Sequence, residues 1–166
     1  MVTREALGVD IGGVIIARVG VDTDTSSFGE NYLDTPQVRD AVDVIRQLVD
    51  GRFGRRVFLI SKCGPRHRAK ALRWMKRHRF FERAGIKAKQ VRFCMERSEK
   101  APICRDLGIT HFVDDRLDVL LSLTTVPYRF WLDVSATSDH VQPVPPRSIR
   151  AITGWNGIAR ALLLGG

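Results

Sequence analysis

The stretch ALGVDIGGV, residues 6–14, holds the pattern that decides the fold. Apolar and small residues run without a break from Ala6 to Asp10, which predicts a buried strand with a carboxylate at its carboxyl end. Gly12 and Gly13 follow, and glycine permits the tight backbone turn that a loop directly after a strand requires. The stretch therefore predicts a strand that delivers Asp10 to a glycine-rich loop.

Four further apolar runs predict strands, and helical periodicity fills the segments between them. The strands are expected at 56–61 (RVFLIS), 90–95, 111–114 (HFVD) and 128–132 (YRFWL). The helices are expected at 36–49, 65–81, 100–107, 118–123 and 157–164. Thr35 is the expected N-cap of the first helix, because Pro36 suits the first helical position. This alternation predicts an α/β fold with a doubly wound parallel sheet of about five strands.

The segments outside these elements give no sign of a second unit. Residues 18–34 are polar and suggest an ordered flap that is too short for a lid domain, and residues 135–147 suggest an exposed, proline-rich connection. At 166 residues the chain fits a single domain, 1–166, without a cap. The apolar runs are too short to cross a bilayer and the N-terminus lacks a signal-peptide pattern, so a cytoplasmic location is expected.

The three cysteines fit neither a CxxC pair nor a zinc-ligand cluster. We therefore expect reduced, mostly buried thiols at Cys63, Cys94 and Cys104. A reactive thiol at Cys63, two residues beyond Ser61, is an alternative, although no His or Asp is locally positioned to activate it.

Polar side chains close three of the predicted strands: Asp10, Ser61 and Asp114. In an open parallel sheet, ligands bind outside the carboxyl ends of the strands, so these side chains are expected to converge in one crevice. Two carboxylates brought together there repel each other, and a divalent cation that prefers oxygen ligands, such as Mg²⁺, relieves the repulsion. The sequence therefore predicts a magnesium site.

The order of four motifs resembles the haloacid dehalogenase-like superfamily: VDIGGV, FLIS, ERSEKAP and HFVDD. The resemblance covers most of the chain and implies a three-layer, Rossmann-like fold without a cap domain. It implies that Asp10 is the nucleophile on phosphorus, that Ser61 and Lys100 hold the phosphoryl oxygens, and that Asp114 ligates magnesium.

The same resemblance assigns several supporting roles. Asp115 is expected to aid metal coordination or to orient its loop, and the carbonyl of Gly12 is expected to be a metal ligand. Backbone amides of the loop at Gly12 and Gly13, and the helix start after Ser61 with Lys62, are further candidate phosphate-binding groups. For Asp118, a role in the acidic motif and a role as a helix cap both remain open.

Gly12 is also the main departure from the family pattern. Related phosphatases usually carry a second Asp two residues after the nucleophile, where it acts as general acid and base. Losing such a group typically lowers the rate by about 10²–10⁴-fold. A substitute acid from the substrate or from a nearby residue such as Lys62 or His67, and a leaving group that needs no proton, are all compatible with the sequence.

The net charge of +9 is concentrated in one segment. Residues 62–92 hold twelve Lys and Arg against Glu82 alone, a net of +11 that leaves −2 for the rest of the chain. Such a block favours an anionic partner, such as nucleic acid, another polyanion or an anionic membrane surface. A solvated basic helix, or a contact to an oligomeric partner, are the alternatives. Trp74, Phe80 and Phe81 are expected in the core rather than as stacking platforms for bases.

Two functions follow from these patterns. The first is a magnesium-dependent phosphoryl hydrolase acting through an aspartyl-phosphate, with a nucleotide or nucleic-acid phosphate as the preferred substrate. The second is a protein of the same fold with reduced catalysis, which binds nucleic acid or another polyanion through residues 62–92. Small sugar or nucleotide phosphates as substrates remain a third alternative, and an oligomer is compatible with each.

Overall fold

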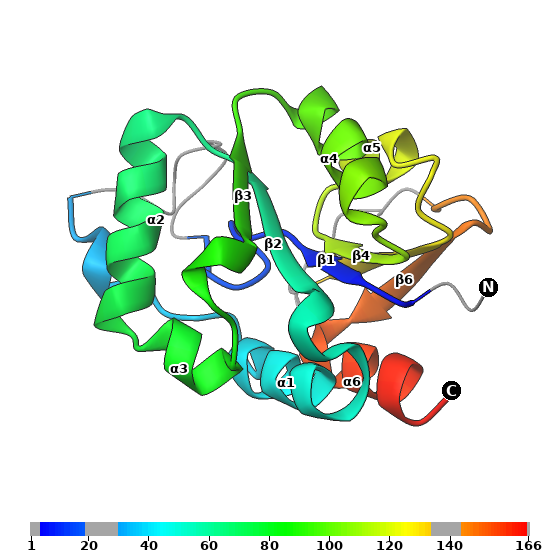
Figure 1. The fold of residues 1–166 in the computed structure, drawn as a ribbon, viewed down its shortest axis with the longest axis horizontal. Helices are drawn as coiled ribbons and strands as arrows, with labels where there is room; N and C mark the ends of the chain where they lie inside the picture. Colours follow the sequence, from blue (N-terminus) through cyan, green and yellow to red (C-terminus); the bar gives the residue numbers. More distant parts are fainter. Residues whose placement is uncertain (1–3, 19–29, 134–143, 166) are drawn as a thin grey trace.

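The fold is built on a six-stranded parallel sheet (Figure 1), seen in a computed structural model that describes residues 4–18, 30–133 and 144–165. The strand order is β3-β2-β1-β4-β5-β6, and every neighbouring pair is parallel. The strands are β1 (Leu7–Val9), β2 (Val57–Lys62), β3 (Val91–Cys94), β4 (His111–Asp114), β5 (Tyr128–Asp133) and β6 (Ile149–Thr153). This order confirms the predicted α/β class and the Rossmann-like, doubly wound arrangement.

Helices cover both faces of the sheet (Figure 1). They are α1 (Ala41–Leu48), α2 (Pro65–Arg77), α3 (Phe80–Ala84), α4 (Lys100–Leu107), α5 (Leu117–Ser122) and α6 (Gly154–Leu163). One core cluster joins α1, α2, α3 and α6 to the sheet, and a second joins α4 and α5 to the opposite face. The described residues contain no cap over the sheet. They also contain no helix that is both long and apolar enough to cross a membrane.

The central strand β1 shows how the two faces are filled. Leu7 and Val9 belong to the cluster with α1 and α6. Gly8 points to the other face, where a β-carbon would lie only 2.5 Å from the Phe112 ring. A side chain at position 8 would displace that ring, so glycine lets the aromatic side chain pack directly on the backbone of the central strand.

The predicted start of the first helix is wrong. The helix α1 begins at Ala41 rather than at Pro36, because residues 36–38 pair with the loop after β1. Ala17 N donates to Pro36 O at 2.9 Å, and Val38 N donates to Ile15 O at 2.7 Å. These bonds hold the loop after β1 against the rest of the fold.

One predicted helix is divided in the structure, and one strand was not predicted. The helix expected at 65–81 is divided into α2 and α3, because Arg79 adopts a left-handed conformation with φ of 51°. The sixth strand, β6, was not predicted. It lies at the edge of the sheet and its burial does not alternate, with Ile149 and Ile152 buried and the residues between them exposed. The expected flap and proline-rich connection fall mainly on residues 19–29 and 134–143, which lie outside the described residues.

Candidate functional site

The candidate site lies at the carboxyl ends of β1 and β4, the two adjacent strands at which the winding direction of the sheet reverses. Asp10 follows β1 directly, and its backbone N donates to Val113 O at 3.1 Å. Asp114 is the last residue of β4. Because these strands are hydrogen-bonded in parallel register, the two carboxylates emerge side by side at one edge.

Lys100 joins the two carboxylates. Its Nζ donates to Asp10 Oδ1 at 2.9 Å and to Asp114 Oδ2 at 2.8 Å. The three side chains are buried: Lys100 is 2% exposed, Asp10 7% and Asp114 0%. The sequence-predicted Asp10, Lys100 and Asp114 are therefore brought together in one contact network.

The turn before α4 sets the position of Lys100. Glu99 Oε2 accepts hydrogen bonds from Met95 N at 2.8 Å and Glu96 N at 2.6 Å, which folds the chain after β3 into a short 3-10 turn. The helix then starts at Lys100, so that its side chain extends from the first helical position toward β1 and β4. The acidic residues of ERSEKAP thus have a structural role in placing the lysine.

Burial and charge shift the pKa values of this network in opposite directions. Burial alone would lower the pKa of Lys100, but the negative charges of Asp10 and Asp114 outweigh it and raise that pKa above its usual value. Complete burial, reinforced by Asp10, raises the pKa of Asp114. The lysine therefore stays an ammonium, and the crowded carboxylates need cations nearby in order to ionise.

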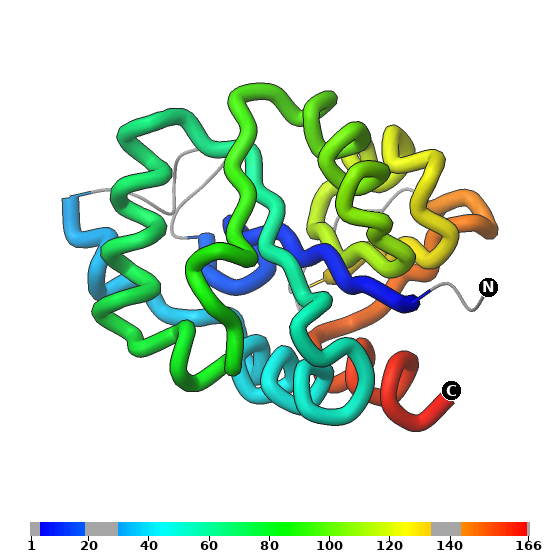
Figure 2. Tube along the Cα trace, in the orientation of Figure 1, coloured from blue at the N-terminus to red at the C-terminus, as the bar shows by residue number. Residues whose placement is uncertain are grey.

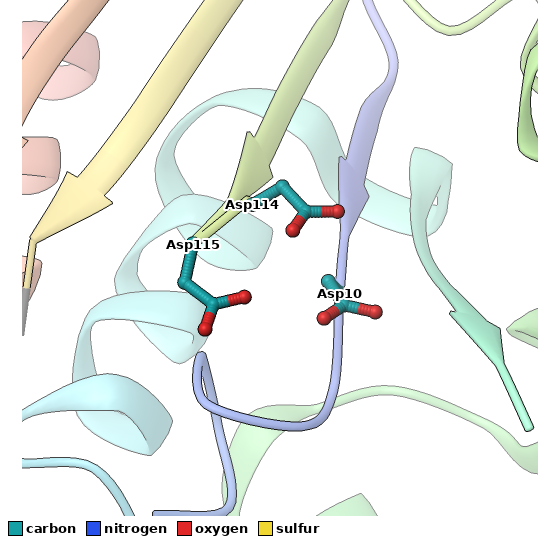
Figure 3. A group of neighbouring side chains, drawn as sticks. All are labelled: Asp10, Asp114 and Asp115. Carbon is teal, nitrogen blue, oxygen red and sulfur yellow. The ribbon is translucent and has the colours of Figure 1, made fainter. Parts of the chain in front are cut away.

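Asp115 completes a group of three acidic side chains (Figure 3). Asp10, Asp114 and Asp115 each offer one carboxylate oxygen, and these oxygens lie within 4.8 Å of one another. Arg18 Nη2 contacts Asp115 Oδ2 at 2.9 Å. Asp115 Oδ1 is buried and makes no hydrogen bond within the described part of the chain. Burial and the neighbouring Asp10 raise the pKa of Asp115.

These residues fit a divalent cation that prefers oxygen. An unsatisfied buried carboxylate oxygen costs free energy, and a cation placed among the three carboxylates would satisfy it. Three carboxylates against the ammonium of Lys100 and the guanidinium of Arg18 leave a formal charge of −1. Arg18 carried no motif or spacing signal in the sequence, and sequence reasoning missed it.

The loop after Asp10 packs closely on Asp115. Gly13 has φ of +77°, and a β-carbon there would overlap Asp115 Oδ2, so a larger residue would push the carboxylate aside. The amide of Gly13 already donates to Ile16 O at 2.8 Å. A β-carbon on Gly12, in contrast, would have no heavy atom within 4 Å. The phosphate-binding roles of Gly12 and Gly13, and the Gly12 carbonyl as a metal ligand, stay predictions.

Ser61 and Lys62 lie at the end of the neighbouring strand β2. This strand pairs with β1 through Val9 and Leu59, so Ser61 emerges at the same edge as Asp10. Ser61 is 7% exposed, and Lys62 is exposed. Their contacts with a substrate stay predictions.

The structure argues against two of the alternatives that the sequence left open. Cys63 is buried, and burial raises the pKa of its thiol to about 11, so the reactive thiolate is scarce at neutral pH. Asp118 is exposed in the first turn of α5, where its Oδ1 pairs with Arg116 Nε at 3.2 Å. The N-cap of that helix is Arg116, so Asp118 is not its N-cap residue.

The basic segment forms a surface next to the site. The helix α2 begins at Pro65, directly after β2, so its first turn with exposed Arg66 lies at the carboxyl edge of the sheet. Further exposed cationic side chains follow at Arg73, Lys76 and Arg77. We call these four residues the α2 basic face.

The aromatic residues of this segment pack in the core. Trp74 and Phe80 are fully buried, and Trp74 Nε1 donates to Thr35 O at 2.8 Å. Phe81 is partly buried against the same cluster. The expectation that they belong to the core is confirmed, so base stacking on these rings is not needed to explain them.

The comparisons with known proteins add no assignment to this geometry. No protein-family model matches the chain, and a search of curated proteins found no match.

Proposed function

We propose that the protein is a magnesium-dependent phosphoryl hydrolase of the haloacid dehalogenase-like type, with Asp10 as the nucleophile. The observation that carries the proposal is the convergence of Asp10, Asp114 and Asp115 around the buried ammonium of Lys100. A structural salt bridge needs one carboxylate for one lysine. This site gathers three carboxylates, and one buried oxygen among them has no hydrogen bond from any of the described residues.

Charge explains why a cation belongs to this reaction. Without metal the site has a formal charge of −1, which repels a phosphate ester. Magnesium held by Asp10, Asp114, Asp115 and the Gly12 carbonyl would supply two positive charges. These would offset the negative charges of the phosphoryl oxygens. The site would then be +1 and would attract the substrate.

Asp10 performs the first step in this proposal. One of its carboxylate oxygens attacks phosphorus, and the bond from phosphorus to the leaving oxygen breaks with its electron pair going to that oxygen. A water molecule then attacks phosphorus of the aspartyl-phosphate, which releases phosphate and restores the carboxylate. Lys100 holds Asp10 in place and offsets the negative charge that builds up during the attack. The Ser61 hydroxyl donates a hydrogen bond to a phosphoryl oxygen.

The leaving oxygen must still gain a proton. Gly12 has no side chain to deliver it, and the structure has room for one at that position. The proposal therefore includes slow turnover of substrates with poor leaving groups, unless Lys62, His67 or the substrate itself supplies the proton.

The α2 basic face favours a polyanionic substrate. Arg66, the first residue of this face, lies beside the carboxyl ends of the strands. The described residues place no cap over these strand ends. A nucleotide or a nucleic-acid end could therefore reach Asp10 while its other phosphates lie near α2.

The deciding experiment is a panel of phosphate esters with and without magnesium. The panel contains p-nitrophenyl phosphate, nucleoside monophosphates and an oligonucleotide with a terminal phosphate. We expect metal-dependent phosphate release that disappears in Asp10→Asn. Asp118→Asn is the matched control, because it makes the same chemical change at an exposed aspartate paired with Arg116. Turnover that survives Asp10→Asn, or no turnover on any ester, would contradict the proposal.

A second function, polyanion binding with reduced catalysis, is favoured by the α2 basic face together with Gly12. It predicts that a fluorescent single-stranded oligonucleotide binds with an affinity that falls as salt rises. Binding should weaken when Arg73 and Arg77 are both replaced by Ala and should be unchanged in Asp10→Asn. Fluorescence anisotropy at two salt concentrations measures this binding, and the absence of turnover in the phosphate-ester panel separates this function from the hydrolase.

A further inference from the structure

Arg68 is a half-buried arginine whose Nε has no hydrogen-bond acceptor among the described residues. It lies in the first turn of α2. Arg56, Arg92 and Arg129 are also half-buried, but each donates to a backbone carbonyl. A buried donor without an acceptor costs free energy, so Arg68 needs an explanation that these contacts do not give.

The ring of Phe93 supports the guanidinium of Arg68. The guanidinium lies over this ring, with Cζ 5.2 Å from the ring centroid. A guanidinium that stacks on an aromatic face keeps the N–H groups at its edge available to donate. Because no hydrogen bond within the described part of the chain fixes Nε, the group can turn toward a ligand without breaking one.

The sheet register places Phe93 beside the candidate site. Phe93 is level with Ser61 on the neighbouring strand, so both side chains leave the same face of the sheet. Ser61 in turn emerges at the same edge as Asp10. Burial raises the pKa of the Cys63 thiol, the charge of Arg68 lowers it and that of Asp10 raises it, so both charges lie near this thiol. Arg68 therefore lies near the carboxyl ends of β2 and β3.

Arg68 and Lys100 approach the strand ends from opposite faces of the sheet. Arg68 belongs to α2, which follows β2 after a short turn (Figure 2). Lys100 belongs to α4, and the two helices pack in separate core clusters on the two faces. A phosphoryl group held at Asp10 by Lys100 would leave Arg68 available for a second group of the same substrate.

The charge around Arg68 favours an anion as that second group. Among the described residues, no carboxylate is paired with this guanidinium. The planar fork of an arginine binds phosphate or carboxylate through two parallel N–H···O bonds. A phosphate carries up to two negative charges and a carboxylate one, so a phosphate gains more from the net +11 of residues 62–92.

We propose that Arg68 binds a second phosphate group of the substrate while the first phosphate lies at Asp10. The substrate class is thus a phosphate monoester that carries a further phosphate, such as a nucleoside bisphosphate, rather than a simple monophosphate. The inference rests on the proposed function, because the site of that function holds the first phosphate. It makes Arg68 a specificity residue that acts on substrate affinity rather than on the chemical step.

The test compares the binding of bisphosphates and monophosphates by isothermal titration calorimetry. The protein is the Asp10→Asn variant with magnesium, which removes the nucleophile of the proposed function. The probes are adenosine 3′,5′-bisphosphate against adenosine 5′-monophosphate, and fructose 1,6-bisphosphate against fructose 6-phosphate. We expect a bisphosphate to bind at least about tenfold more tightly than its monophosphate, because it makes one more charge-assisted contact. The pair that shows this preference identifies the substrate as a nucleotide or a sugar phosphate.

Variants assign the preference to Arg68. Arg68→Met should abolish it and leave the affinity for the monophosphate unchanged. Methionine keeps an apolar stem against Phe93 and removes a buried donor without an acceptor, so the free energy of unfolding should not fall. Arg68→Lys should keep part of the preference, because it keeps the charge but loses the fork. Arg160→Met is the matched control, because Arg160 is exposed in the last turn of α6, and only the start of that helix lies at the carboxyl end of β6.

Three results would overturn the proposal. They are equal affinity for bisphosphate and monophosphate in both pairs, a preference that survives Arg68→Met, and an equal weakening of both ligands by Arg68→Met. The phosphate-ester panel is independent of this readout. An inactive panel with an Arg68-dependent preference would contradict only the hydrolase, and an active panel without that preference would contradict only the role of Arg68.

Discussion

Replacing Lys100 by methionine tests the centre of the candidate site. Methionine keeps a long unbranched side chain but removes the ammonium that bonds to Asp10 at 2.9 Å and to Asp114 at 2.8 Å. Two buried carboxylates would then face each other, with Asp115 close by. Breaking a buried ion pair by removing one partner typically costs about 3–5 kcal/mol. We expect the free energy of unfolding to fall by about that amount at neutral pH without metal.

Urea unfolding followed by circular dichroism measures this loss. Domains of ordinary stability unfold with about 5–15 kcal/mol, which leaves a folded variant to study. Lys76→Met is the matched control, because Lys76 is exposed on α2 and its replacement should change stability by about 0.5 kcal/mol or less. A loss below about 1 kcal/mol in Lys100→Met would refute the reasoning, because it would mean that the lysine does not neutralise both carboxylates.

Magnesium gives this experiment a second readout. Removing the ammonium leaves the three carboxyl groups with one fewer positive charge to support their ionisation, so a divalent cation should stabilise Lys100→Met more than the wild-type protein. The difference in unfolding free energy between the two proteins should therefore narrow as magnesium is added. An equal shift in both proteins would indicate that the cation binds away from the three carboxylates.

Three further predictions concern other parts of the molecule. Gly8→Ala should destabilise the protein by about 1–3 kcal/mol in urea unfolding, because the added β-carbon would meet the Phe112 ring. The β-carbon of Gly12→Ala would lie in open space, so this variant should lose much less stability. His111 should make the free energy of unfolding fall by about 1–2 kcal/mol, after allowance for solvent screening, as pH drops from about 6.5 to 4. Burial lowers its pKa to about 4, so in this window the unfolded chain binds a proton that the folded chain does not. His111→Phe should remove this contribution to the pH dependence. Gly12→Asp should increase kcat for esters with poor leaving groups, measured against p-nitrophenyl phosphate, if the missing general acid limits turnover; no change would point to an acid from elsewhere.

The sequence predicted the parts of the fold in which burial and periodicity agree. β1, β2 and β4 are central strands buried on both faces, so each is a continuous apolar run that ends in a polar residue. That pattern also located Asp10, Ser61 and Asp114. β6 was not predicted, because an edge strand needs neither a continuous apolar run nor strict alternation of apolar and polar residues. Its burial pattern shows neither of them.

The interactions that complete the site depend on tertiary structure. Lys100 was singled out by its motif, but its contact with both Asp10 and Asp114 depends on where α4 starts, which the bonds of Glu99 to the preceding turn determine. Arg18 reaches Asp115 only because the loop after β1 folds back and pairs with residues 36–38. The same pairing moved the start of α1, so one long-range contact explains both a missed residue and a wrong boundary.

The charge distribution links the site to its surroundings. The carboxylate site carries a formal charge of −1 without metal, although α2, which starts at the same edge of the sheet, carries exposed arginines. A surface of this kind attracts an anion over a Debye length of about 8 Å at physiological salt, but it cannot cancel the repulsion that the anion meets in contact with three carboxylates. Under the proposed function, attraction at a distance and acceptance at the site would therefore require different groups: the α2 basic face for the first, and Lys100 with a bound cation for the second. The proposed function would thus account for an acidic cluster at the carboxyl ends of β1 and β4 in a basic chain.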